Sequence, residues 1–121
     1  MNVLGIETSC DETSAAVVRG LTQVRSCVVS SSLALHRKFG GIIPEIAFRK
    51  QLETISGVVD CALSEARSKI KDIDCISVTS GPGLLGSLLV GISFAKGLSL
   101  ATGIPLVGVN HLHAHIYAAF L

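Results

Sequence analysis

Three histidines lie within five residues near the end of this sequence of 121 residues, in the stretch NHLHAH at residues 110–115. On an α-helix each residue advances by about 100°, so His111 and His115 share one face and His113 lies on the other side. Two neutral imidazoles one helical turn apart suit zinc or divalent iron, because both lone pairs can converge on one point. The pair is not a complete site, and an isolated HxxxH is more often two ordinary helix histidines.

A second group of reactive side chains is the acidic stretch ETSCDET at residues 7–13, between two short apolar runs. Its backbone N–H groups and hydroxyls, with Ser9 and Thr13 as candidates, suit contact with phosphate. Its acids, with Asp11 and Glu12 as candidates for catalysis, suit contact with a metal or with water. The alternative is a plain hairpin turn, since Asp, Ser and Thr favour turns in any case.

A third candidate is the glycine-rich stretch TSGPGLLGS at residues 79–87. A turn of this kind between a buried strand and a helix leaves backbone N–H groups free, so Gly81 and Gly83 are candidates for binding an anionic substrate or nucleotide. The stretch matches neither GxGxxG nor GxxxxGK[ST]. The alternative is close backbone packing, for which glycine is also required.

Hydrophobic periodicity outlines the elements that must position these residues. Five short runs of apolar residues predict strands, at residues 2–6, 14–18, 24–30, 75–79 and 104–109. Pro44 predicts the start of a helix, and apolar residues at helical spacing extend that helix from Leu52 to Ile70. A loop is predicted before this helix, at residues 36–41. A second, apolar helix ends at Gly103, and the histidines lie on a third.

The order of these elements predicts an α/β fold, with a five-stranded mixed sheet and flanking helices. The first three strands follow one another closely and should form an antiparallel meander, whereas the last two are each reached through a helix and should run parallel. Loops at the carboxyl ends of such strands share one edge of the sheet. We expect the acidic loop, His111 and His115 to meet at that edge.

Composition and charge exclude several classes of protein. Apolar residues make up 49% of the chain and the formal net charge is +1, which predicts one small globular domain without general attraction to nucleic acid or an acidic membrane. Residues 84–101 are the only candidate membrane span, but Lys96 and three glycines within them favour a buried helix and no membrane. Four dispersed cysteines and the lack of an apparent secretory segment indicate reduced thiols and a cytoplasmic location.

Four stretches taken together resemble one family. They are GIETSCDET at residues 5–13, HRKFGGIIPEIAFR at 36–49, the glycine turn at 79–86, and IPLVGVNHLHAH at 104–115. In this order they are similar to the TsaD/Gcp family, also called YgjD, which was once labelled O-sialoglycoprotein endopeptidase and now comprises tRNA threonylcarbamoyladenosine synthases. The resemblance extends over all 121 residues.

The resemblance implies a fold and a metal site. The family has two ribonuclease-H-like lobes of the actin and sugar-kinase superfamily, so residues 1–121 would be a truncated N-terminal lobe without the second one. Its catalytic metal, iron(II) in preference to zinc, would be held by His111 and His115 together with an aspartate outside this chain. Where the family has a histidine, this sequence has Gln51, which puts a polar role for that position in doubt.

The resemblance also implies an activity. The full-length protein would transfer threonylcarbamoyl from threonylcarbamoyl-adenylate to N6 of the adenosine 3′ of the tRNA anticodon, with TsaB-like and TsaE-like proteins as partners. Asp11 or Glu12 could be the general base. The chain alone is expected to be inactive and to form a homodimer through this lobe, since residues such as Ile116 and Phe120 would be exposed. The alternatives are a TsaB-type interaction module and, less favoured, a metalloprotease, because HExxH requires a glutamate where Leu112 stands.

Overall fold

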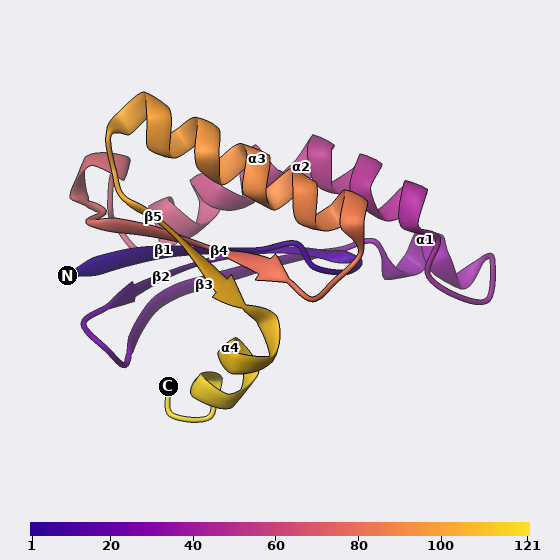
Figure 1. The fold of residues 1–121 in the computed structure, drawn as a ribbon, viewed down its shortest axis with the longest axis horizontal. Coiled ribbons are helices and arrows are strands. Elements are labelled where there is room, and N and C mark those ends of the chain that lie inside the picture. Colours follow the sequence, from indigo (N-terminus) through magenta and orange to yellow (C-terminus); the bar gives the residue numbers. More distant parts are fainter.

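The computed structural model describes the backbone of residues 1–121 and every side chain except that of Leu35. Five strands form one mixed sheet, and two long helices lie across one of its faces (Figure 1). The strands are β1 (Asn2–Glu7), β2 (Glu12–Arg19), β3 (Gln23–Ser31), β4 (Cys75–Gly81) and β5 (Leu106–Asn110). The helices are α1 (Leu33–Arg37), α2 (Pro44–Glu65), α3 (Leu85–Thr102) and α4 (His111–Ala118), with a short 3₁₀ turn over Ile70–Asp72.

The central strand of the sheet is β1, in the order β3-β2-β1-β4-β5. It pairs antiparallel with β2, which pairs antiparallel with β3, so the predicted meander is confirmed. Its other edge pairs parallel with β4, which in turn pairs parallel with β5. The carboxyl ends of β1, β4 and β5 therefore lie at one edge of the sheet, as predicted.

The hydrophobic core lies between the sheet and the helices α2 and α3. Alternate residues of β1 and β4 supply it from the sheet, and all four are at most 3% exposed: Leu4, Ile6, Ile76 and Val78. Burying such a side chain contributes about 1.5–3 kcal/mol, which strongly fixes the register of both strands. Because side chains alternate along a strand, Glu7 then points to the opposite face.

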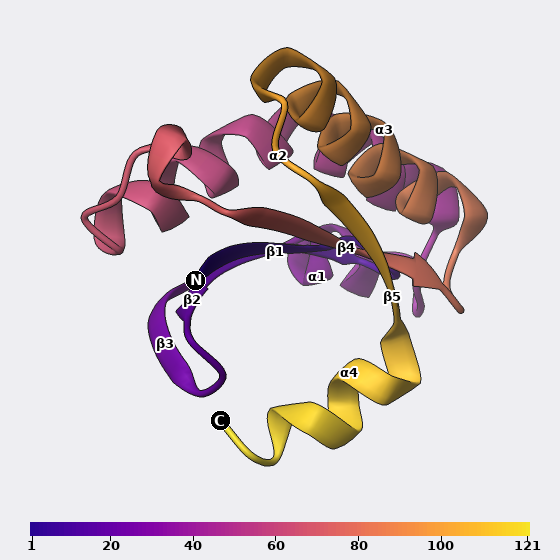
Figure 2. The same cartoon turned by 60° about the vertical axis from the view of Figure 1, so that its left-hand side comes forward.

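The opposite face of the sheet is concave. The sheet curls around this face, and α4 lies across the hollow from the strands, on the side away from α2 and α3 (Figure 2). The helix α4 begins at His111, directly after the last residue of β5, so no loop separates the two elements. The concave face is therefore the one that presents Glu7 and the histidines to each other.

The helix α2 begins at Pro44, as predicted, but it ends at Glu65 and not at Ile70. Arg67 adopts a left-handed backbone conformation with φ 52°, and the N–H of Ser68 donates to the carbonyl of Leu63 at 3.0 Å. This is the Schellman pattern that closes a helix. Ile70 keeps helical spacing because it packs on the same core from the separate 3₁₀ turn, which is why periodicity alone overextended the helix.

The stretch predicted as a loop at residues 36–41 begins with the last residues of α1. His36 is only 1% exposed. Its Nδ1 accepts a hydrogen bond from the N–H of Ile43 at 3.1 Å, and its Nε2 lies 2.8 Å from the hydroxyl of Ser32. That hydroxyl donates to the carbonyl of Asp11 at 2.8 Å. The histidine thus connects α1 to the acidic loop through contacts that a local pattern does not reveal.

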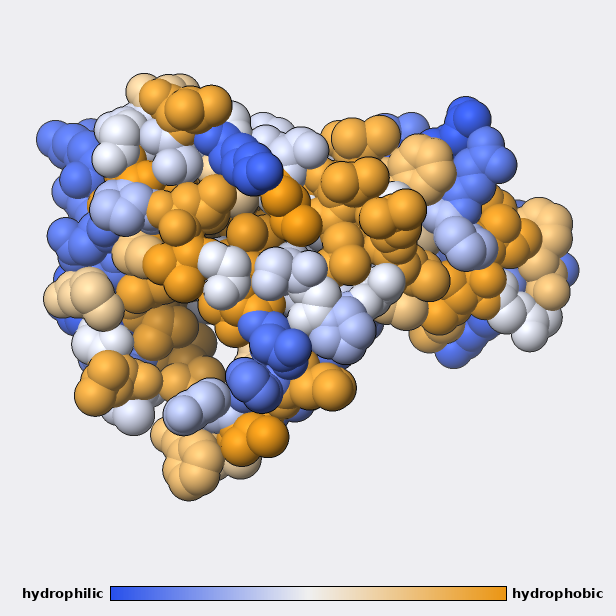
Figure 3. All heavy atoms as spheres, in the orientation of Figure 1, coloured by the Kyte–Doolittle hydropathy of each residue, from blue (hydrophilic) through white to orange (hydrophobic). Residues whose placement is uncertain are grey.

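The helix α3 was predicted to be buried, and this is right for one face only. Its inner face, including Val90 and Ala95, packs on the sheet and on α2. On its outer face Leu85 is 75% and Leu100 is 88% exposed, and apolar side chains gather over this part of the surface (Figure 3). By length and composition alone the helix is apolar enough to cross a membrane. It ends at Gly103 with φ 75°, as predicted.

Candidate functional site

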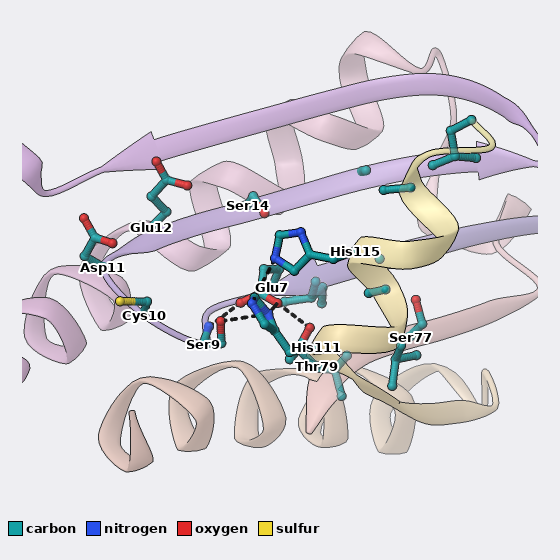
Figure 4. A pocket seen from close by; sticks show the side chains of 18 residues that line it. Glu7, Ser9, Cys10, Asp11, Glu12, Ser14, Ser77, Thr79, His111 and His115 are labelled. Atoms are coloured by element: carbon teal, nitrogen blue, oxygen red, sulfur yellow. Dashed lines mark hydrogen bonds and ion pairs between the residues drawn. The ribbon is translucent and has the colours of Figure 1, made fainter. Parts of the chain in front are cut away.

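Side chains from the carboxyl ends of β1, β4 and β5 meet on the concave face (Figure 4). Glu7 ends β1, Thr79 lies in β4, and His111 follows β5. Oε2 of Glu7 accepts a hydrogen bond from the hydroxyl of Thr79 at 2.5 Å and lies 3.1 Å from Nδ1 of His111. Oε1 accepts a hydrogen bond from the backbone N–H of Ser9. The parallel arrangement of three strands thus brings a carboxylate and a histidine together across 104 residues of chain.

Glu7 is held in its charged form by this environment. Burial raises the pKa of its carboxyl group, but hydrogen bonds from Ser9, Thr79 and His111 lower the pKa by more, so that it lies below the ordinary 4.5. A carboxyl group with a lowered pKa stabilises the fold above its unfolded-state pKa, and this contribution disappears as the pH falls through the folded-state value. At neutral pH the site therefore contains a fixed negative charge beside His111.

The two histidines predicted to share a helix face do so. Nε2 of His115 lies 3.0 Å from Nε2 of His111, and the two rings meet edge to face. Asn110 caps α4, since its side-chain oxygen accepts hydrogen bonds from the N–H groups of Leu112 and His113. The cap fixes the first turn of the helix and with it His111. The side chain of His113 is exposed and is not among the residues that line the pocket.

The histidine pair fits a transition-metal ion in its donor atoms and spacing. Two nitrogen ligands at 2.0–2.1 Å from a tetrahedral zinc ion stand roughly 3.3 Å apart, so a separation of 3.0 Å needs only a small rotation of the rings. Imidazole nitrogen also suits iron. Among the described side chains, no group of three or more His, Cys, Asp or Glu residues is arranged so that it could hold a metal ion by itself.

The pocket beneath the sheet has a volume of about 520 Å³ and is open to solvent. Small residues of the concave face form its roof, among them Gly5, Ser14, Ala16 and Ser77, and α4 forms its opposite wall. Because these side chains are short, the space next to the histidines stays unfilled. The pocket is therefore large enough for part of a substrate, with the imidazoles at one side.

The acidic loop contributes Ser9, Cys10, Asp11 and Glu12 to the pocket wall. The hydroxyl of Ser9 lies 3.1 Å from Nδ1 of His111, so this predicted residue reaches the histidines. Asp11 and Glu12 lie apart from the histidines, at one end of the pocket (Figure 4). Burial and the neighbouring Asp11 raise the pKa of the Cys10 thiol, which keeps it protonated at neutral pH. The assignment of Asp11 and Glu12 to catalysis stays a prediction.

The structure does not bring three other predicted site residues to the pocket. Thr13 faces α2 and is 2% exposed. Gly81 and Gly83 belong to a turn that packs against the acidic loop, because the N–H of Leu84 donates to the carbonyl of Ser9 at 2.7 Å. A Cβ atom on Gly83 would lie 2.5 Å from that carbonyl oxygen. Close packing, the alternative interpretation of the glycine stretch, therefore accounts for Gly83, and neither glycine lines the pocket.

Gln51 has a polar role, which the departure from the family's histidine at this position had put in doubt. The side chain is 1% exposed. Its Nε2 donates toward three backbone carbonyls of the acidic loop, at 3.4 Å from Thr8, 3.0 Å from Cys10 and 2.9 Å from Glu12. The reversed amide would place Oε1 against three carbonyl oxygens, so this orientation is the favourable one. Gln51, which lies in α2, thus holds the acidic loop, and with it Asp11 and Glu12, from the side of that helix.

Replacing Gln51 by leucine is expected to lower the free energy of unfolding by about 1–3 kcal/mol, because buried carbonyls of the loop lose their donor. Chemical denaturation of the 121-residue chain measures this change. The same substitution at Gln23, which is exposed at the start of β3, is the control and should change stability by less than about 0.5 kcal/mol. Equal effects at both positions would show that Gln51 does not hold the loop.

The sequence did not predict the contacts that Glu7, Thr79 and Gln51 make. Glu7 was visible only as one of three carboxylates in the loop. Its position directly after an apolar strand, at the edge shared with the histidines, was the signal that singles it out. No comparable signal marks Gln51, because its partners are backbone atoms about 40 residues away along the chain.

Comparisons with known sequences point to one family. The family model described as "TsaD: tRNA N6-adenosine threonylcarbamoyltransferase" matches residues 23–121. A curated tRNA N6-adenosine threonylcarbamoyltransferase from Clostridium botulinum strain Hall is 56% identical over 121 residues, and one from Thermodesulfovibrio yellowstonii is 58% identical over the same length. Each alignment covers all of this chain and 36% of the relative. The chain thus spans about a third of the length of these relatives.

Comparisons with solved structures concern the fold. YeaZ from Pseudomonas aeruginosa superimposes with a TM-score of 0.65 at 19% identity, over 90% of this chain and 42% of that one. The structure of T. thermophilus RuvC in complex with a Holliday junction substrate superimposes with a TM-score of 0.58 at 14% identity, over 93% of this chain and 66% of that one. At such identities the likeness shows the fold alone. The expected α/β fold, with its five-stranded mixed sheet and flanking helices, is thereby confirmed.

Proposed function

The chain belongs to the tRNA N6-adenosine threonylcarbamoyltransferase family, and on that premise we propose that residues 1–121 supply the metal-binding side of its catalytic site. The observation that carries the proposal is the pair His111 and His115, whose Nε2 atoms face each other at 3.0 Å beside a pocket of about 520 Å³. Glu7, a charged group hydrogen-bonded to His111, supports it.

In the proposed reaction, N6 of the adenosine 3′ of the tRNA anticodon forms a bond to the carbamoyl carbon of threonylcarbamoyl-adenylate, and the bond from that carbon to the phosphate oxygen breaks, so that AMP leaves. A divalent ion at the histidines, iron(II) in preference to zinc, would supply Lewis-acid stabilisation of a carbonyl or phosphate oxygen. His111 and His115 would hold it, and the sheet face would shield the donor from water. Asp11 or Glu12 would take the proton from the attacking amine. Both line the pocket, and the choice between them stays open.

The alternative of a TsaB-type interaction module agrees equally well with the fold, which YeaZ shares. The histidine pair favours the transferase, because a module that only binds a partner has no need of two converging imidazoles. The alternative of a metalloprotease is weaker. Its HExxH helix places a glutamate next to the first histidine to activate water, whereas this chain has Leu112 there.

The proposal is tested with a chimera in which residues 1–121 replace the matching segment of the Clostridium botulinum transferase. We expect the purified chimera to form threonylcarbamoyladenosine in tRNA, given threonine, bicarbonate, ATP and partner enzymes, and quantified by nucleoside analysis. The 121-residue chain alone is the control, and it should give no product above background. A chimera that folds and binds its partners but forms no product would contradict the proposal.

Partners and location are also proposals. We propose tRNA and TsaB-like and TsaE-like proteins as partners, in the cytoplasm, where the four free cysteines would stay reduced. The expected exposure of apolar residues on and just after α4 is confirmed: Ile116 is 62%, Tyr117 72%, Phe120 71% and Leu121 59% exposed. A surface of this kind favours association. The homodimer of the isolated chain stays a prediction.

A further inference from the structure

We infer that Glu7 is a positioning residue, which holds the imidazole of His111 with its proton on Nδ1 and so directs the free lone pair of Nε2 toward His115. This inference deepens the proposed function and rests on it for the identity of the bound ion. It assigns to Glu7 a role distinct from those of Asp11 and Glu12, which line the same pocket without contacting the histidine rings.

The carboxylate of Glu7 accepts hydrogen bonds from two donors besides His111. An ionised carboxylate can only accept hydrogen bonds. Its Oε1 accepts from the N–H of Ser9, and its Oε2 accepts from the hydroxyl of Thr79 at 2.5 Å. Because Ser9 and Thr79 both donate to the carboxylate, the acidic loop and β4 hold it in place independently of His111.

The contacts of the His111 ring determine which of its nitrogens carries the proton. Its Nδ1 lies 3.1 Å from Oε2 of Glu7 and 3.1 Å from the hydroxyl oxygen of Ser9. Because the carboxylate can only accept, the proton of this contact lies on Nδ1. A neutral imidazole carries one N–H, so Nε2 of His111 is then unprotonated. The lone pair of Nε2 points to Nε2 of His115, 3.0 Å away, where a metal ion would bind.

Glu7 differs from a merely structural residue because it acts on the metal-binding nitrogen of His111 through the other nitrogen of the ring. The charge of the Glu7 carboxylate sets the tautomer of the His111 ring. The carboxylate oxygen of Glu7 and the hydroxyl oxygen of Ser9, both next to Nδ1, fix the rotation of the ring. A histidine ligand whose second nitrogen donates to a carboxylate binds metal more strongly, and removal of such a partner typically costs 10–100-fold in affinity. No hydrogen bond joins Asp11 or Glu12 to either ring among the described contacts, so they are suitable comparisons.

The tautomer is measured on the metal-free 121-residue chain by ¹⁵N–¹H NMR correlations of the histidine rings. We expect His111 in the wild type to be protonated at Nδ1. In the Glu7→Gln and Glu7→Ala variants we expect a mixture that includes protonation at Nε2, which free histidine prefers. His113, which is exposed, is the internal control and should not change. Protonation of wild-type His111 at Nε2 alone would overturn the inference without any need for a variant.

Affinity is measured by titrating zinc ions alone into the same proteins. We expect the dissociation constant to rise by about 10–100-fold in Glu7→Ala and by less in Glu7→Gln, whose amide oxygen still accepts but lacks the charge that strengthens the bond. Glu12→Gln removes a pocket charge that does not contact the rings, and it should change zinc affinity by less than about threefold. In a His111→Ala background, Glu7→Gln should have no further effect.

Two results would contradict the inference: zinc affinity in folded Glu7→Ala within about twofold of the wild type, or equal losses in Glu7→Ala and Glu12→Gln. If Glu7→Ala fails to fold, Thr79→Val is used instead, since it frees one side of the Glu7 carboxylate and leaves His111 unchanged; we expect an intermediate loss of affinity. Neither NMR nor zinc binding requires tRNA, so this inference can fail while the chimera stays active, and the reverse.

Discussion

Replacing His111 by alanine in the active chimera is expected to lower the rate of tRNA modification by at least about 100-fold. The substitution removes one of the two facing imidazole nitrogens, which are the proposed metal ligands, and the only hydrogen-bonding contact between α4 and Glu7 in the described side chains. Loss of metal-ion stabilisation of a transition state costs several kcal/mol, and each 1.36 kcal/mol is about a factor of ten in rate. Initial rates of nucleoside formation and the metal content of the purified protein measure the effect.

His113→Ala is the matched control for that experiment. It changes the same residue type in the same helix, but its side chain leaves α4 away from the pocket. We expect metal content and rate to stay within about twofold of the parent chimera, because a surface substitution usually changes stability by no more than about 0.5 kcal/mol. A loss at His113 as large as the loss at His111 would mean that the facing pair is not the metal site.

Replacing Gly83 by alanine is expected to destabilise the fold by about 1–3 kcal/mol, the usual cost of inserting an atom into closely packed structure. A Cβ there would lie 2.5 Å from the carbonyl oxygen and 2.8 Å from the Cβ of Ser9. A backbone atom cannot rotate away, so the acidic loop must shift. Since Ser9 also contacts His111, we expect the ring signals of His111 to move as well. Denaturant unfolding and NMR of the 121-residue chain measure the two effects.

Gly57→Ala provides the comparison, because it is the same chemical change at an open position. Gly57 lies within α2, and a Cβ atom there would meet nothing within 4 Å. Glycine inside a helix costs roughly 0.5–1 kcal/mol relative to alanine, so this substitution should stabilise the chain. The opposing signs make the test sharp. If Gly83→Ala is also neutral or stabilising, the glycine turn is not packed against the loop as described.

The parts of the site that follow from periodicity and topology could be predicted. Spacing of four residues places His111 and His115 on one face of α4, and the rule for parallel strands brings them to the edge where the acidic loop lies. Neither step needs knowledge of side-chain contacts. The five strands and the meander follow equally from short runs of apolar residues and short connections.

What could not be predicted depends on contacts between distant segments. The hydrogen bond from Thr79 to Glu7 depends on the register of β1 with β4, which places the two side chains next to each other. The polar role of Gln51 follows from three carbonyls that converge only when α2 packs on the sheet. Ile70 shows the limit of periodicity itself, because a residue can keep helical spacing and still reach the core from another element.

The central place of β1 also has a consequence for the order in which the chain acquires its parts during synthesis. The meander β1–β3 needs only the first 31 residues, so it can pair early, while the edge of β1 that later receives β4 stays open until residue 75 is available. Such long-range parallel pairing is slow to form, and an unpaired edge invites association with other chains. His111 reaches Glu7 only after 104 residues. We therefore expect the imidazole pair to be completed only on a sheet that is already assembled.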